Sequence, residues 1–252
     1  MKQFRYTLNR ALSPATPDTP EIRYGALEDI KFSQVRLLPP CAPTKIVAVG
    51  RNYQEHAKEF GNPPPAEPII FLKPPSSLIA SGDAIVYPSA LSKRVDFEGE
   101  LGLVIGRRAR NVRGEEALAC VLGYTCVNDV TARDLQKSDS QWTRGKGFDT
   151  FCAVGPCLVP KEDVDFTKLR VRTLVDGEVK QDASVLEMIF PIEAIIEYVT
   201  AFMTLEPGDL IATGTPAGVG PIAPGSTVRV EIEGIGVLEN PVVKGETWDD
   251  SK

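Results

Sequence analysis

The segment that most restricts the fold is an apolar run headed by two glutamates, residues 96–106 (DFEGELGLVIG). Side chains two apart on a β-strand share one face, so Glu98 and Glu100 would lie side by side. Two like charges against an apolar strand repel each other and lose hydration, and a divalent cation would compensate for both. The alternative is an edge strand with both glutamates facing solvent and paired with Lys or Arg. The two residues alone leave both interpretations open.

A second strand-like segment, residues 123–129 (GYTCVND), also ends in an acid, Asp129. Hard cations such as Mg²⁺ prefer oxygen ligands, and three carboxylates can bind one face of such an ion while leaving positions for a substrate. The sequence therefore predicts a candidate metal site formed by Glu98, Glu100 and Asp129.

Short strand-like segments separated by turns dominate the chain. Asp176-Gly177, between β-branched residues, is typical of a type I′ hairpin. Helices are few: residues 115–119, and residues 191–203 with an apolar stripe, preceded by a capping box at 184–187. We expect an α+β, mostly β protein and not a regular βαβ succession. The expected strands are residues 45–50, 68–72, 101–105, 169–175, 209–212 and 227–232.

Two regions are expected along the chain. Residues 1–45 form a small N-terminal module, with short strands at 4–6 and 21–24 around a turn-rich stretch and a proline-rich linker at 39–43. Residues 46–252 form the main domain.

Composition excludes several classes of partner. The net charge is −6 and the acids are interspersed, so a nucleic acid or an anionic membrane is not an expected partner. The five cysteines include no C-x-x-C pair, which argues against a disulfide framework or a zinc knuckle. No signal-peptide core or bilayer-length apolar run is present, and the expected location is the cytoplasm.

The single histidine of the chain, His56, is followed three residues later by Glu59. On a helical turn these side chains meet, and the carboxylate would orient the imidazole and help it to take a proton from water. The alternative is a surface histidine near an unrelated glutamate. Spacing alone does not separate the two.

Two glycine-rich segments could contact a ligand. Lys146 lies between glycines and could bind a substrate carboxylate or stabilise negative charge, although an exposed loop lysine has the same pattern. Residues 213–220 lack the Gly-Lys-Ser/Thr ending of a phosphate loop, but their amides or the Thr215 hydroxyl could hold a carboxylate. No Gly-x-Ser-x-Gly elbow occurs, so a serine hydrolase is not expected.

In this order, the segments of residues 45–243 closely resemble the fumarylacetoacetate hydrolase superfamily. The matching segments are 49–53 (VGRNY), 56–59 (HAKE), 71–74 (FLKP), 96–100 (DFEGE), 128–134 (NDVTARD), 146–149 (KGFD), 207–209 (PGD) and 213–216 (TGTP). Gly147 and Ala153 depart from the serine and proline that are frequent in the family, which affects the expected substrate preference and not the metal site.

The resemblance implies a β-rich roll or sandwich with mixed strands, few helices, a small N-terminal module and a homodimeric assembly. It also implies that Glu98, Glu100 and Asp129 bind Mg²⁺ or Mn²⁺, and that His56 and Glu59 form a water-activating pair on a lid. Lys146 and Gln136 are the other implied catalytic residues. The implied substrate-binding residues are Arg51, Tyr53, Arg133 and Thr215.

The implied substrate is a small 2-oxo or 2-enol dicarboxylic acid that reacts through a metal-stabilised enolate. The first expectation is hydrolytic C–C cleavage of an acylpyruvate-type compound. Isomerisation or decarboxylation of hydroxymuconate-like or oxaloacetate-like acids is the alternative, since all three reactions need the same enolate. A non-catalytic metal- or ligand-binding homologue is the alternative from another class.

Overall fold

The computed structural model describes residues 1–8, 23–25, 35–59, 61 and 63–245. Strands dominate, as predicted, and the α+β, mostly β class is confirmed. The strands are β1 (Phe4–Leu8), β2 (Arg23–Gly25), β3 (Val35–Leu38), β4 (Ile46–Gly50), β5 (Ile69–Lys73), β6 (Leu78–Ile79), β7 (Ile85–Tyr87), β8 (Val95–Phe97), β9 (Gly99–Ile105), β10 (Val121–Asp129), β11 (Thr131–Ala132), β12 (Cys152–Pro160), β13 (Arg170–Val175), β14 (Glu178–Ser184), β15 (Leu210–Ala212), β16 (Gly220–Ile222), β17 (Thr227–Ile232) and β18 (Gly236–Lys244). The α-helices are α1 (Gln54–Glu59), α2 (Glu115–Ala119), α3 (Arg133–Ser138), α4 (Thr143–Lys146) and α5 (Ile192–Phe202).

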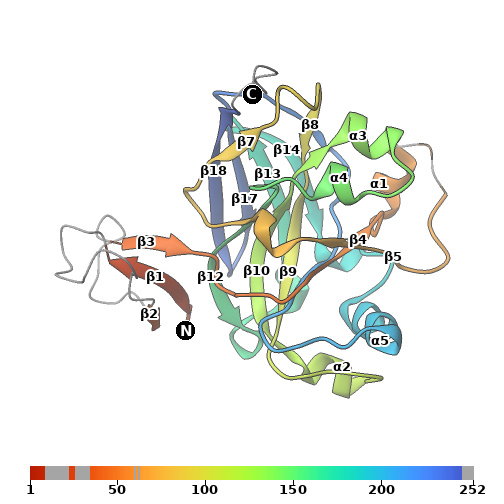
Figure 1. Ribbon diagram of the computed structural model, residues 1–252. Helices are drawn as coiled ribbons and strands as arrows, with labels where there is room; N and C mark the ends of the chain where they lie inside the picture. The colour runs from red at the N-terminus through yellow and green to blue at the C-terminus, as the bar shows by residue number, and fades with distance from the viewer. Residues whose placement is uncertain (9–22, 26–34, 60, 62, 246–252) are drawn as a thin grey trace.

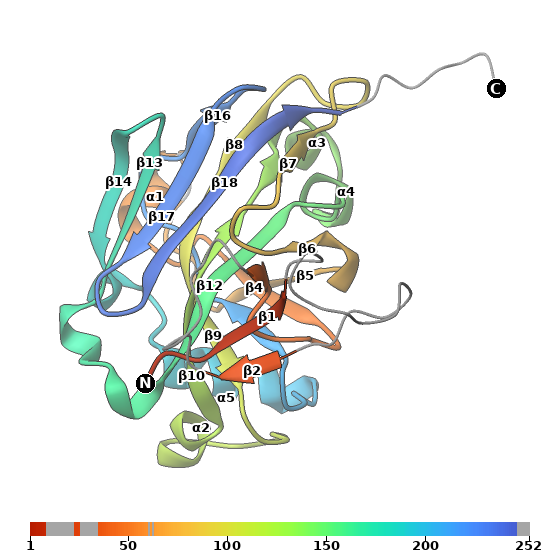
Figure 2. The same ribbon diagram turned by 90° about the vertical axis from the view of Figure 1, so that its left-hand side faces the viewer.

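Two large mixed sheets form the body of the protein. One has the order β5-β4-β15-β9-β10-β12-β6 and the other β14-β13-β17-β18-β7. Figure 1 shows β9 and β10 running through the middle of the molecule, with α1, α3 and α4 gathered on one side near the start of β9. Figure 2 shows β14, β13, β17 and β18 side by side as one layer. Contacts between β13 and β9 and between β17 and β10 join the two sheets.

The main core lies between these layers and includes the apolar stripe of α5. Ile192, Ile195, Ile196 and Val199 are at most 3% exposed, as expected for a stripe that packs rather than binds. The predicted capping box is present, with Ser184 and Glu187 exchanging hydrogen bonds. It caps the 3₁₀ turn Val185–Glu187 and not α5, which begins after Pro191.

Two neighbouring segments change sheets at the same place, which the sequence did not indicate. The strand expected to carry Glu98 and Glu100 together is interrupted at Glu98: β8 pairs with β11 and β16, and β9 belongs to the seven-stranded sheet. The chain after Asp129 does the same, because β10 pairs with β9 whereas β11 pairs with β8. The backbone N–H of Asp129 donates to the carbonyl of Glu98 at 2.8 Å. The two crossings are therefore held side by side.

Asp209 joins the beginnings of the parallel pair β4 and β15. Its carboxylate is fully buried and accepts hydrogen bonds from the backbone N–H of Thr44 (2.9 Å), Lys45 (3.1 Å) and Glu206 (2.7 Å), and from the Thr44 hydroxyl (2.7 Å). Lys45 adds an ion pair through Nζ. The matched PGD segment thus has a structural role, since it fixes the register of the two strands.

The N-terminal strands form a separate sheet, β2-β1-β3, which projects from the body in Figure 1. Gln3 pairs with Leu158 of β12 and connects this sheet to the main one. The predicted turn at residues 13–18 lies outside the described residues, and the division at residue 45 stays a prediction. Within the described part of the chain, no helix is long and apolar enough to cross a membrane.

Candidate metal centre and active site

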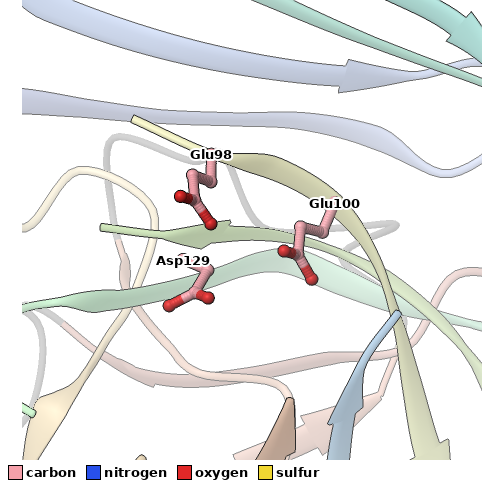
Figure 3. Close-up of side chains that lie close together, drawn as sticks. All are labelled: Glu98, Glu100 and Asp129. Carbon is pink, nitrogen blue, oxygen red and sulfur yellow. The ribbon is translucent and has the colours of Figure 1, made fainter. Parts of the chain in front are cut away.

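The three predicted acids meet at the double sheet crossing. Glu98, Glu100 and Asp129 are 4%, 2% and 1% exposed, and one oxygen of each lies within 4.8 Å of the others. Figure 3 shows the three side chains close together, with Glu100 on β9, Asp129 at the end of β10 and Glu98 in the link just before β9. The edge-strand alternative is thereby excluded, because β9 is an inner strand with a neighbour on each side.

Buried cations surround this acid cluster. Lys146 Nζ donates to Glu98 Oε2 at 2.7 Å and to Asp129 Oδ2 at 2.5 Å, whereas Lys73 Nζ donates to the other Asp129 oxygen, Oδ1, at 2.6 Å. Arg133 donates to Glu98 and, at 2.9 Å, to Asp96. Buried carboxylates need such partners, since an isolated buried charge is strongly unfavourable.

Of the three acids, Glu100 has its negative charge compensated least by these cations. Glu100 accepts a hydrogen bond from the backbone N–H of Gly214 at 2.8 Å. Burial raises the pKa of Glu100 well above its usual value, and the negative charges of Asp129 and Glu98 raise it further. Burial also raises the pKa of Glu98, but Lys146 and Arg133 outweigh it and hold that pKa well below the usual range. Three hard oxygen donors and the uncompensated negative charge of Glu100 suit a divalent cation, so the cluster could hold one.

We expect metal binding to release protons because of Glu100. Below its raised pKa, the carboxyl is protonated, and a cation must displace the proton in order to bind. Affinity for Mn²⁺ should therefore weaken as the pH falls. Calorimetric titrations in two buffers of different ionisation enthalpy would measure the released protons. Equal heats in both buffers, with an affinity that does not change with pH, would contradict this expectation.

His56 and Glu59 come together on α1, as their spacing predicted. His56 Nδ1 lies 3.2 Å from Glu59 Oε2, and the imidazole is 5% exposed. The other carboxylate oxygen, Oε1, accepts from the backbone N–H of Gly218 at 3.2 Å. Burial lowers the pKa of His56, and the carboxylates of Glu98 and Glu59 oppose this only in part. The imidazole is therefore neutral at pH 7 and able to accept a proton.

A cavity of about 340 Å³ connects these groups. Nine of the eleven predicted site residues line it: Arg51, His56, Glu98, Glu100, Asp129, Arg133, Gln136, Lys146 and Thr215. Glu59 does not line the cavity, but it contacts His56, which does. Tyr53 is buried, its hydroxyl has no hydrogen-bond partner within the described part of the chain, and it does not line the cavity.

Arg133 and Gln136 are already bonded to each other, with Arg133 Nη1 donating to Gln136 Oε1 at 2.6 Å. Arg133 therefore acts mainly on Glu98, Asp96 and Gln136.

Several cavity residues were not predicted. Trp142 packs edge-on against Phe71, with ring centroids 5.3 Å apart, and Arg51 lies 5.9 Å above its indole ring. A Cβ on Gly50 would approach Trp142 to 2.7 Å, so glycine gives the indole room there. Lys137 also lines the cavity. Phe71 lies inside a matched segment and Trp142 lies four residues before another, Lys146–Asp149, but no spacing rule connects residues this far apart in the chain.

The family assignment and the relatives agree with this geometry. A family model, Fumarylacetoacetate (FAA) hydrolase C-terminal, matches residues 45–243. Protein Rv2993c of Mycobacterium tuberculosis is 54% identical over 214 residues, covering 84% of this chain and 80% of that protein. The Xenopus laevis protein named oxaloacetate tautomerase fahd2, mitochondrial, is 43% identical over 222 residues, covering 84% and 69%.

Among solved structures, 2-hydroxyhepta-2,4-diene-1,7-dioate isomerase from Mycobacterium marinum is similar over nearly the whole chain. It has a TM-score of 0.83 and 43% identity, with 98% of this chain and 100% of that chain covered. The match spans the predicted β-rich fold as well as the segments that carry the acid cluster. The chain therefore belongs to the fumarylacetoacetate hydrolase family, whose members are hydrolases, isomerases or tautomerases.

Proposed function

We propose that the protein catalyses proton transfer at the carbon next to the keto group of a small 2-oxo dicarboxylic acid, interconverting its keto and enol forms as a homodimer. The observation that carries the proposal is a buried, neutral His56 lining the same cavity as three clustered carboxylates. Relatives named as an oxaloacetate tautomerase and a dienedioate isomerase support this choice of reaction.

Glu98, Glu100 and Asp129 would hold the divalent cation. When bound, the cation would polarise the keto oxygen and stabilise the negative charge of the enolate. Lys146 stays close to Glu98 and Asp129 and adds a fixed positive charge beside the developing oxyanion.

His56 is the proposed base. Its Nδ1 lies 3.2 Å from Glu59 Oε2, and Glu59 stabilises the imidazolium that forms when the ring takes a proton from carbon. The imidazolium then delivers this proton to the enolate oxygen to give the enol. In the opposite direction His56 takes the hydroxyl proton of the enol and returns it to carbon, so one proton moves between carbon and oxygen and no other reactant is needed.

The positive side chains of the cavity wall indicate a negatively charged substrate. Arg51, Arg133, Lys137 and Lys146 all line it, and Arg51 and Lys137 lie outside the acid cluster. These cations favour an anion, and the second carboxylate of a dicarboxylic acid fits them better than a neutral tail does.

Hydrolysis of an acylpyruvate, the first expectation from the sequence, is the second candidate. The same His56–Glu59 pair could take a proton from a water molecule, which then attacks the distal carbonyl. The two candidates differ in whether a C–C bond breaks.

The test follows both reactions with purified protein, with and without Mg²⁺ or Mn²⁺. We expect metal-dependent acceleration of oxaloacetate ketonisation, observed as loss of the enol ultraviolet absorbance, with no C–C cleavage of acetylpyruvate. Cleavage of acetylpyruvate without ketonisation of oxaloacetate would favour the hydrolase instead. If neither substrate reacts, the proposal is wrong.

A further inference from the structure

Gln181, on β14 of the five-stranded sheet, contacts the peptide between two of the candidate metal ligands. The side chain is 1% exposed. Its Oε1 accepts a hydrogen bond from the backbone N–H of Gly99 at 3.0 Å. Gly99 belongs to the seven-stranded sheet and separates Glu98 from Glu100, so this bond links the acid cluster to the opposite layer.

The same amide takes part in a closed ring of hydrogen bonds. Gln181 Nε2 donates to Thr215 Oγ1 at 2.7 Å and to the carbonyl of Pro216 at 2.8 Å. The Thr215 hydroxyl in turn donates to the carbonyl of Gly99 at 2.8 Å. The N–H and the C=O of Gly99 are therefore both fixed by side chains from elsewhere in the chain.

Gly99 is closely confined from the same direction. Gln181 is paired with Thr173 across β13 and β14, so both side chains lie on the face toward Gly99. A Cβ on Gly99 would come within 2.0 Å of Thr173 Oγ1. Only glycine fits here. Because glycine has no Cβ, its backbone is less restricted than that of other residues. Its orientation must come from its hydrogen bonds.

This ring also defines what Thr215 can offer a substrate. A hydroxyl has one proton, and that of Thr215 is donated to Gly99. The oxygen already accepts from Gln181, so toward the cavity it can act only as an acceptor. A carboxylate is itself only an acceptor, so the predicted binding of a substrate carboxylate through this hydroxyl does not fit the hydrogen bonds.

We propose that Gln181 is a positioning residue that aims Glu98 and Glu100 at the metal through the Gly99 peptide, with Thr215 closing the ring. The proposal rests on the proposed metal site. Removing a group that orients metal ligands typically weakens metal affinity about 10–100-fold. A purely structural role would instead lower thermal stability without a specific effect on the metal.

The experiment measures Mn²⁺ affinity of the metal-free protein by calorimetry and by the electron paramagnetic resonance of free Mn²⁺. Gln181→Met keeps the length of the side chain and removes every hydrogen bond of the amide. The matched control is Val171→Ala, on β13 two residues from Thr173 and fully buried in the main core. This control should lower the melting temperature without touching the ring. Thr215→Val and the double variant complete a mutant cycle.

We expect Gln181→Met to weaken Mn²⁺ binding about 10–100-fold and Val171→Ala to leave it within about twofold of the wild type. Since one ring is broken in either single variant, the double variant should bind little more weakly than Gln181→Met alone. Wild-type affinity in Gln181→Met, or an equal loss in Val171→Ala, would overturn the positioning role and leave the proposed function standing. A wild-type protein that does not bind Mn²⁺ would overturn both.

Discussion

Replacing His56 by alanine should lower the rate of substrate ketonisation by roughly 10²–10⁴-fold, the usual contribution of general base catalysis. The imidazole is buried, neutral and oriented by Glu59. His56 lines the cavity, and the sequence contains no other histidine. Initial rates at saturating Mg²⁺ or Mn²⁺ would measure the loss. Affinity for Mn²⁺ should change little, because His56 is not one of the three clustered acids.

Glu55→Gln is the matched control for this variant. Glu55 lies on the same helix, is exposed, and pairs with Lys58 at 2.7 Å. Its replacement should leave both the rate and Mn²⁺ binding unchanged. An alanine variant of His56 that keeps more than about a tenth of the wild-type rate would exclude His56 as the base. If the wild-type protein binds metal but turns over no substrate, the non-catalytic alternative is favoured.

Replacing Asp209 by alanine should lower the free energy of unfolding by roughly 3–5 kcal/mol, the cost typical of breaking a buried charged network. The change leaves the backbone N–H groups of Thr44, Lys45 and Glu206 without their shared acceptor. Urea unfolding would measure the effect. Asp182→Ala is the control: this exposed acid pairs with Arg170, and such a surface pair contributes at most about 1 kcal/mol.

The contribution of Asp209 should also depend on pH. Burial raises the pKa of this carboxyl, but the hydrogen bonds from Glu206, Lys45 and Thr44 outweigh it, and the folded-state pKa is lowered. A lowered pKa means that the stabilisation is complete above the unfolded-state value of about 4 and is lost as the pH falls through the folded-state value. The difference in stability between wild type and Asp209→Ala should therefore shrink in acid. A difference that stays constant down to strongly acidic pH would contradict this assignment.

Local sequence patterns predicted the elements whose apolar residues follow a regular strand or helix spacing. β4, β5, β13, β15 and β17 follow from their apolar runs, and α5 follows from its stripe of isoleucines. The interruption at Glu98 was missed because a change of sheet leaves the local pattern of apolar and polar residues intact. The capping box was found, but the sequence could not show that it caps the start of a 3₁₀ turn and not the start of α5.

The resemblance located most of the cavity, but not what supports it. Lys73 reads as the end of an ordinary strand, and Gln181 as one polar residue in an exposed hairpin, yet both are buried against the acid cluster or its backbone. Tyr53 shares a matched segment with Arg51, but the chain turns between them, with Arg51 at a φ of 57°, and only Arg51 lines the cavity.

The sequence by itself determined the mostly β fold class, the family, and the pair of glutamates that needs a compensating charge, because strand periodicity and short motifs are local. Only the tertiary structure decided how that charge is compensated. It placed Lys146 against Glu98 and Lys73 against Asp129, left Glu100 undercompensated, and fixed Gly99 from the opposite sheet. Burial and long-range contacts set these energies, and neither is encoded in the spacing of neighbouring residues.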